Sequence, residues 1–341
     1  MMKKIRLLLF TLAMIASFVI AGCTSSSSES TSGIGGASGK ETFPVRMAID
    51  TAAGGSFQFR AAEKQGYFEK NGVDAQISNF AMGVDTINAV LTKQTDTGLA
   101  ADYVAINSVA KGDLVIIATL TRANEHSSKE QQLLVKGDIN KPSDLKGKKI
   151  GVNKGTVNEY VWSQYLKKNQ IKETDVDFVP FSTPDEAIVG VQQGDIEAVW
   201  ASGSLLEKYK AINGVHQLDD LLGAGVSIDS YLLADRSFVE QNPQAIENTL
   251  KALNEGIQYV KGNKEDTAKL AFEQLKIPAE DALKDIERQN YVVGFSKEDA
   301  QHLEEMKEWI EEKGLLKESF DLKDKLIIDP LKKVLPESVT Y

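Results

Sequence analysis

Short apolar runs that alternate with amphipathic stretches constrain the fold of this chain more than any other feature. The runs are rich in β-branched residues, and the stretches between them have helical periodicity. We predict strands at 45–49, 73–80, 97–101 and 114–120, and helices at 56–66, 85–93 and 103–111. Strands that alternate with helices in this way predict a mainly parallel sheet with helices on both faces.

The same order of elements then starts again. We predict further strands at 132–135, 149–152, 176–181, 198–201 and 231–234, and helical segments at 143–145, 156–169, 184–193 and 205–210. From Asn242 to about residue 313 the chain reads as mostly helical. Two such units predict an α/β protein with two mixed, mainly parallel sheets, and a body of about 300 residues is long enough for two lobes.

The N-terminus has the pattern of a secretory signal peptide. Lys3, Lys4 and Arg6 precede an apolar run from Leu7 to Ile20, and small residues lead to Cys23, the only cysteine. The pattern resembles the bacterial lipoprotein signal, which implies that residues 1–22 are removed and that Cys23 is acylated. The alternatives are an ordinary signal peptide with a chance cysteine, and a membrane-spanning helix, for which about 20 apolar residues are needed.

The segment after the cysteine is almost entirely Ser, Gly and Thr, so we expect 23–42 to be the lipidated cysteine and a flexible tether, with the folded body starting near Phe43. With Cys23 acylated, no thiol remains for a disulfide or a zinc cluster, and we expect neither cofactor nor metal. The formal net charge of −10 argues against nucleic acid and against anionic lipid as partners of the body. Membrane contact is therefore expected through the lipid anchor only.

Five segments resemble one protein family in their order and spacing. They are AEKQGYFEKNGV at 62–73, LTKQTDTG at 91–98, DLKGKKIGV at 144–152, the stretch 187–198 and FVEQNP at 238–243. With them the chain, over about residues 43–315, resembles the nitrate, sulfonate and taurine group of solute-binding lipoproteins that serve ABC importers. Gln94 departs from the family pattern, in which glycine is usual.

The resemblance implies a two-lobed, type II periplasmic-binding-protein fold whose lobes close on a ligand by a hinge motion. Lobe I would comprise 43–124 plus 234–341, and lobe II would comprise 125–233. It also implies an extracytoplasmic, monomeric protein that binds a small sulfonate, taurine or nitrate-like solute and delivers it to the permease subunits of an importer. A thiamine pyrimidine or another neutral heterocycle stays open as the ligand.

The residues themselves also indicate a ligand site, because ligands of open α/β sheets bind beyond the carboxyl ends of the strands. Three glycine-containing loops there lead into predicted helices, and helix N-termini offer free N–H groups to an oxyanion. Well-capped helices in tight loops are the structural alternative. The candidate ligand-binding residues are Asp50, Thr51, Ser56, Phe57, Gly83, Val84, Ala101, Asp102, Gly155, Thr156, Val157, Trp200, Ser202 and Tyr231.

Charged residues near these loops leave the ligand's own charge open. Asp102 stands where family members often have glycine and proline, and a carboxylate there would disfavour a bare anion and suit an amine. Arg60 and Arg122 could supply a countercharge. The aromatic candidates, such as Trp200 and Tyr231, could form apolar walls or belong to the core.

An enzyme is the main competing interpretation. The three histidines, His126, His216 and His302, are widely spaced and show neither metal-ligand nor catalytic-triad spacing. The chain has no G-x-S-x-G, P-loop or H-E-x-x-H sequence. Enzymes do occur on this fold among thiamine-pyrimidine synthases, so the fold alone does not decide between binding and catalysis. We predict a binding protein.

Overall fold

The structure is a computed structural model that describes residues 41–51, 54–203, 205–316 and 318–341. The predicted signal peptide, Cys23 and the tether up to residue 40 lie outside the described residues. None of the described helices is long and apolar enough to span a membrane.

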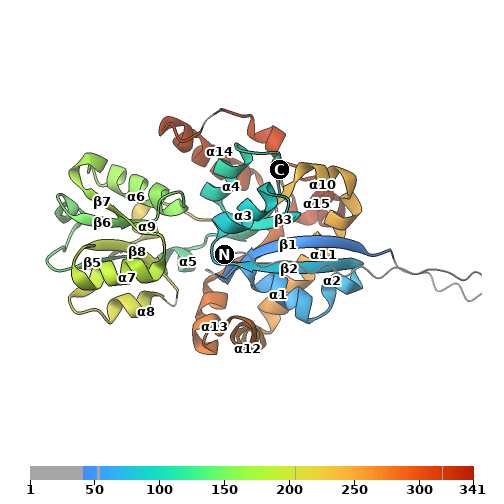
Figure 1. The fold of residues 1–341 in the computed structure, drawn as a ribbon, viewed down its shortest axis with the longest axis horizontal. Helices are drawn as coiled ribbons and strands as arrows, with labels where there is room; N and C mark the ends of the chain where they lie inside the picture. Colours follow the sequence, from blue (N-terminus) through green and yellow to red (C-terminus); the bar gives the residue numbers. More distant parts are fainter. Residues whose placement is uncertain (1–40, 52–53, 204, 317) are drawn as a thin grey trace, which may run out of the picture. The chain divides into compact units, whose positions relative to one another are not determined.

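A six-stranded mixed sheet forms the first unit (Figure 1). Its strands are β1 (Phe43–Asp50), β2 (Val73–Phe80), β3 (Thr97–Ala101), β4 (Leu114–Arg122), β10 (Ser230–Asp235) and β11 (Asn290–Gly294), in the spatial order β11-β4-β10-β3-β1-β2. β1 pairs in parallel with β2 and β3, whereas β10 is antiparallel to β3 and β4, and β11 is antiparallel to β4. Four strands therefore share one direction, and β10 and β11 run against them.

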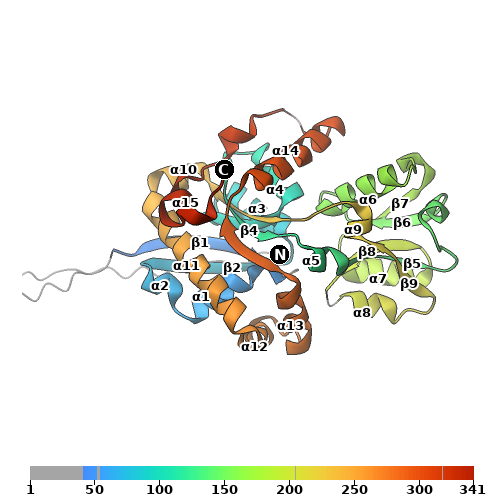
Figure 2. The same ribbon diagram turned by 180° about the vertical axis from the view of Figure 1, so that it is seen from behind.

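Helices cover both faces of this sheet. They are α1 (Phe57–Lys64), α2 (Tyr67–Lys70), α3 (Gly83–Leu91), α4 (Asp102–Val109), α10 (Arg236–Gln241), α11 (Pro243–Gly262), α12 (Lys264–Leu275), α13 (Ala279–Arg288), α14 (Lys297–Glu312) and α15 (Asp329–Val334). α3 and α4 lie on one side, and α1, α2 and α11 lie on the other (Figures 1 and 2). Every residue of β4 from Leu114 to Thr121 is buried, because both faces of that strand are covered.

A five-stranded mixed sheet forms the second unit. Its strands are β5 (Gln131–Lys136), β6 (Lys149–Val152), β7 (Asp177–Pro180), β8 (Ala198–Ser202) and β9 (Val215–Asp220), in the order β7-β6-β8-β5-β9. Its helices are α5 (Glu125–Lys129), α6 (Val157–Lys168), α7 (Pro184–Gln193), α8 (Leu205–Lys210) and α9 (Leu221–Ala224). Successive residues of β5 point to opposite faces, so Leu133 packs in the cluster that contains Trp162, and Leu134 in the cluster that contains Val191.

The chain passes between the units twice, and both passages lie at the carboxyl edges of the sheets. It leaves the six-stranded unit at the end of β4 and returns to it at the start of β10. A strand that enters a sheet from its carboxyl edge must run against its neighbours. This explains why β5 is antiparallel to β8 and β10 is antiparallel to β3 and β4.

The predicted fold class, α/β with two mixed, mainly parallel sheets, is confirmed. The predicted strands and helices are present. The bounds of β2, β3, β6, α7 and α8 are as predicted, and those of the other elements differ by one to a few residues. Two strands, β9 and β11, were not predicted. β11 interrupts the C-terminal region that the sequence indicated as helical, and it adds an edge strand to the six-stranded sheet.

Candidate ligand-binding site

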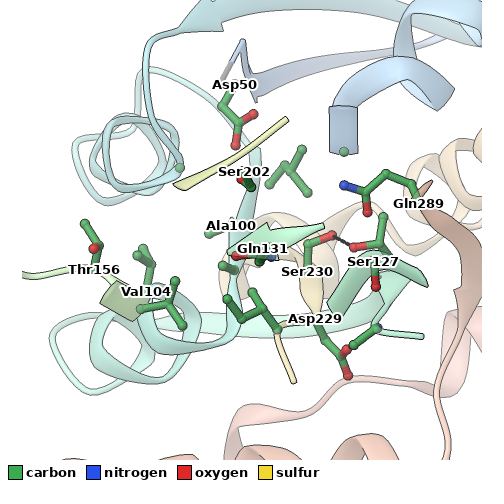
Figure 3. A pocket seen from close by; sticks show the side chains of 18 of the residues that line it. Asp50, Ala100, Val104, Ser127, Gln131, Thr156, Ser202, Asp229, Ser230 and Gln289 are labelled. Carbon is green, nitrogen blue, oxygen red and sulfur yellow. Dashed lines mark hydrogen bonds between the residues drawn. The ribbon is translucent and has the colours of Figure 1, made fainter. Parts of the chain in front are cut away.

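A cavity of about 300 Å³ lies where strand ends of both sheets come together, and we call it the cleft pocket (Figure 3). Strands β1, β3 and β8 contribute their last residues, β4 contributes its last residue but one, and the reversed strands β5 and β10 contribute their first. These residues are Asp50, Ala101, Thr121, Ser202, Gln131 and Ser230. Thr156 and Val104 lie on one side of the pocket, and Ser127 and Gln289 on the other (Figure 3).

Half of the candidate residues line the cleft pocket. They are Asp50, Gly83, Val84, Ala101, Thr156, Val157 and Ser202. They come from β1, β3, β8 and the first turns of α3 and α6 or the residues before them. Space beside Gly83 is tight, since a Cβ at this position would lie 3.3 Å from the Ala100 Cα and in van der Waals contact with Asp50 Oδ2, at 3.5 Å.

The other candidates in the first loop do not line the pocket. Thr51 donates hydrogen bonds to the Phe80 carbonyl from its N–H, at 3.0 Å, and from its hydroxyl. Ser56 is buried and accepts a hydrogen bond from Arg60 Nε at 3.3 Å, while Phe57 belongs to the core. Arg60 itself is buried away from the pocket and donates to Asn79 and Gln274, and burial lowers its pKa.

Asp102 and Tyr231 turn away from the pocket. Asp102 is fully buried as the first residue of α4, and its carboxylate accepts hydrogen bonds from the Tyr103 and Asp229 N–H groups and contacts His302 Nε2 at 2.7 Å. Tyr231 follows Ser230, which lines the pocket, so strand alternation points its ring into the core on the opposite face. Asp102 is therefore committed to an internal network and does not face a ligand in this pocket.

Gly155 and Trp200 also serve the protein interior or the loop itself. The Gly155 N–H donates to Glu159 Oε2 at 3.0 Å, so it is not free for an anion. Trp200 packs edge-on against Tyr165 and Trp162 in the core of the five-stranded unit. The Thr156 side chain caps α6 by accepting from the Asn158 N–H.

The pocket contains polar residues that the sequence analysis did not single out. They are Thr121, Ser127, Ser128, Gln131, Asp229, Ser230, Arg288 and Gln289. The Thr121 and Ser230 hydroxyls lie 2.6 Å apart. The rule that ligands bind beyond strand ends, when applied to the end of β4, would have identified Thr121, Ser127 and Ser128. Arg288 and Gln289 have no such local signal, because α13 reaches the pocket only through the tertiary fold.

Asp229 joins the two passages between the units. Its carboxylate accepts a hydrogen bond from the Ala123 N–H at 2.7 Å, and its carbonyl accepts from the Asp102 N–H at 3.1 Å. Burial raises the pKa of Asp229 to about 6, against the attraction of nearby His302. The pocket thus carries a carboxylate that changes charge near pH 6, at the point where the chain crosses.

Within the described residues, no group of three or more His, Cys, Asp or Glu side chains could hold a metal ion. Hydroxyls and amides dominate the polar lining of the pocket, with acidic groups at Asp50 and Asp229 and a cation at Arg288. Such a lining suits a small ligand that both accepts and donates hydrogen bonds.

Two α/β units that share a ligand-sized pocket at their strand ends define the fold of the periplasmic binding proteins. Residues 56–267 match the family described as NMT1/THI5 like. This match spans more than half of the chain, so the protein belongs to that family.

Relatives of known sequence or structure agree with this assignment. The Escherichia coli K12 protein named "Putative aliphatic sulfonates-binding protein" is 27% identical over 239 residues, 66% of this chain and 70% of the relative. The crystal structure of the periplasmic aliphatic sulphonate binding protein SsuA from Escherichia coli has a TM-score of 0.73 at 21% identity and covers 83% of this chain and 92% of its own.

Two more distant structures show how widely the fold is used. The alkanesulfonate-binding protein SsuA from Xanthomonas axonopodis pv. citri, bound to MOPS, has a TM-score of 0.71 at 15% identity, covering 84% of this chain and 99% of its own. The desulfurization enzyme DSZB has a TM-score of 0.64 at 15% identity, covering 86% and 99%. At these identities the likeness concerns the fold alone.

Proposed function

We propose that this protein is the solute-binding component of an ABC importer, and that its cleft pocket captures a small sulfonate and delivers it to the permease. The observation that carries the proposal is a pocket of about 300 Å³ lined by both α/β units of a member of this family. The names of the sulfonate-binding relatives support the substrate class.

The charged residues of the pocket indicate which kind of sulfonate would bind best. Asp50 lines the pocket at the end of β1, and in Figure 3 its carboxylate points toward the cavity. A carboxylate there repels a bare anion such as nitrate and favours a ligand with an ammonium or N–H group. We therefore place an aminosulfonate of the taurine kind ahead of nitrate, with Asp50 in the role that the sequence suggested for Asp102.

The division into lobes is part of the proposal. Lobe I would be 43–124 plus 234–341 and lobe II 125–233, with the passage near Asp229 and Ala123 as the hinge. Since β10 pairs within the six-stranded sheet from Ser230 onward, we place the second crossing just before that residue, which moves residues 230–233 from lobe II to lobe I. A ligand that contacts both lobes stabilises the closed state in proportion to its preference for that state.

A neutral heterocycle such as a thiamine pyrimidine is the second candidate ligand. The amides of Gln131 and Gln289 favour it, because both line the pocket and an amide both donates and accepts. Catalysis by an enzyme of this fold is a further candidate function. Among the described residues lining the pocket there is no histidine, cysteine or lysine that could activate a serine hydroxyl, which favours binding over catalysis.

Ligand-induced stabilisation of the purified protein tests the substrate class. We expect taurine to raise the melting temperature most, ethanesulfonate less and nitrate least, because Asp50 attracts the ammonium group of taurine and repels a bare anion. A ligand at 100 times its Kd stabilises by about 2.7 kcal/mol. A shift with a thiamine pyrimidine and none with any sulfonate would select the second candidate. No shift with either class would refute the proposal.

We also propose that the mature protein is anchored outside the cytoplasm by acyl chains on Cys23. The Cys23→Ser variant is expected to lose incorporation of a clickable palmitate analogue and to leave the membrane fraction or stay unprocessed, since each buried methylene contributes about 0.8 kcal/mol to anchoring. Fractionation with in-gel fluorescence measures both effects, and Ser25→Ala serves as the control. Undiminished labelling of the Cys23→Ser protein would argue against the anchor.

A further inference from the structure

We propose that Arg288 recognises the anionic group of the ligand, an inference that rests on the proposed function and assigns a residue to it. Arg288 is the last residue of α13 and lines the cleft pocket. Of the described residues that line this pocket, it is the only one with a cationic side chain. A guanidinium presents five N–H groups in a planar fork that matches the oxygens of a sulfonate.

Arg288 lies at the junction of the two units, where a ligand would contact both. A Cβ placed on Gly203 would lie 3.2 Å from Arg288 Nη2, so the guanidinium sits against the turn that follows β8. Ser202, in the same turn, lines the pocket. Arg288 belongs to the six-stranded unit and Gly203 to the five-stranded unit, so a ligand held here is held at their junction.

Arg288 is buried, with 5% of its surface exposed. Water therefore screens its charge little, and its attraction for an anionic ligand is strong. Within the described part of the chain, its ion pair runs from Nε to Asp285 Oδ1 at 3.0 Å. This pair occupies the Nε–H group, and both Nη2 and Asp285 Oδ1 lie against the Gly203 turn. Arg288 also lines a second cavity of about 270 Å³ next to α8 and α13, so it stands between the two cavities.

The helix N-termini of the pocket are weaker anion sites than Arg288. Glu159 lies in the first turn of α6 and accepts the Gly155 N–H, which puts a carboxylate where an oxyanion would bind. Asp85 lies in the first turn of α3. A negative charge at these positions offsets the positive end of each helix dipole.

Asp285 competes with a ligand for the same guanidinium. Its carboxylate is buried, and burial raises its pKa although Arg288 opposes this. Removal of the Asp285 charge should leave Arg288 with more of its positive potential for the ligand. The anion-recognition role therefore predicts opposite effects for the two members of one ion pair, whereas a purely structural role predicts that both changes are harmful.

Titration calorimetry with taurine and ethanesulfonate tests this. We expect Arg288→Gln to weaken binding of both ligands at least about 30-fold, because a charge-assisted bidentate contact is lost. Arg288→Lys should retain an intermediate affinity, since it keeps the charge without the fork. Asp285→Asn should bind both ligands about 5-fold more tightly, by removing the competing carboxylate.

Lys284→Gln is the matched control. Lys284 is exposed, pairs with Asp281 and lines the second cavity but not the pocket, so its removal changes the net charge equally and should leave affinity unchanged. Wild-type affinity in Arg288→Gln, or equal losses in Arg288→Gln and Asp285→Asn, would overturn the inference alone. Absence of sulfonate binding by the wild-type protein would overturn the proposed function and this inference with it.

Discussion

The Asp299→Ala variant is expected to lose about 3 to 4 kcal/mol of unfolding free energy at neutral pH. Asp299 lies in the first turn of α14 and is 2% exposed, and its carboxylate accepts four hydrogen bonds. Arg122 donates two of them, both at 2.7 Å, and Thr119 and the Ser296 N–H donate the others, at 2.9 and 2.8 Å. Breaking a buried ion pair costs about 3 to 5 kcal/mol.

The lower part of that range applies because the Arg122 side chain is 32% exposed and can be rehydrated. Loss of the cap on α14 adds about 1 kcal/mol, since Ser296 and Asp299 form a capping box. Urea denaturation followed by circular dichroism measures the effect. Glu298→Gln, an exposed change in the same helical turn, is the control and should leave the midpoint near the wild-type value.

A double-mutant cycle separates the ion pair from the cap. Arg122→Gln removes the charge partner but leaves the capping box, so Asp299→Asn and Arg122→Gln should be strongly non-additive. Arg122 is the last residue of β4, next to the first passage between the units, and the pair therefore fixes α14 to the proposed hinge. Additive losses, or a loss in Asp299→Ala no larger than in Glu298→Gln, would contradict this assignment.

The strands and helices that the sequence predicted are those with strong hydrophobic periodicity. The unbroken apolar run of β4 and the alternation of β2 are local signals that tertiary packing reinforces. β9 has the sequence VHQLDD, none of whose residues is buried, so it lacks the apolar pattern of a strand. Its pairing with β5 at the edge of the sheet holds it extended. β11 is five residues long and lies between two helices.

The residues of the candidate site also differ in whether a local sequence signal predicts them. Backbone rules located the pocket, because strand ends meet at one edge whatever their side chains, and Asp50, Gly83 and Thr156 were found in this way. Side-chain orientation did not follow from the sequence. Asp102 follows a strand end, yet its side chain points into the protein, where it contacts His302. This partner lies 200 residues further along the chain, so the sequence near Asp102 gives no sign of it. Arg288 reaches the pocket from a helix with no local mark of function.

The orientation of Asp102 leads to a prediction about pH. Asp102 is fully buried, and a buried carboxylate needs a positive partner, which His302 supplies at 2.7 Å. Burial by itself would lower the pKa of His302, but the hydrogen bond and charge of Asp102, with smaller contributions from Asp229 and Glu305, raise it to about 9. The folded protein therefore holds a proton on His302 over a pH range in which the unfolded chain has released it.

Stability is consequently expected to fall as the pH rises from about 6.5 to about 9. A group whose pKa is raised in the folded state contributes its full stabilisation below the unfolded value and loses it as the pH passes the folded value. A rise from 6.5 to about 9 corresponds to about 3 kcal/mol. Asp229, whose folded pKa of about 6 is also raised, changes charge below this window and does not mask it.

Urea denaturation of the wild-type protein and of His302→Gln at several pH values between 6 and 9.5 measures this contribution. The variant should lose most of the decline in unfolding free energy across the window, whatever its absolute stability. His126→Gln, a change at an exposed histidine of α5, should keep the wild-type decline. Parallel pH profiles for the wild type and His302→Gln would show that the His302–Asp102 contact is not a charged pair. The buried carboxylate beside the proposed hinge would then need another source of compensation.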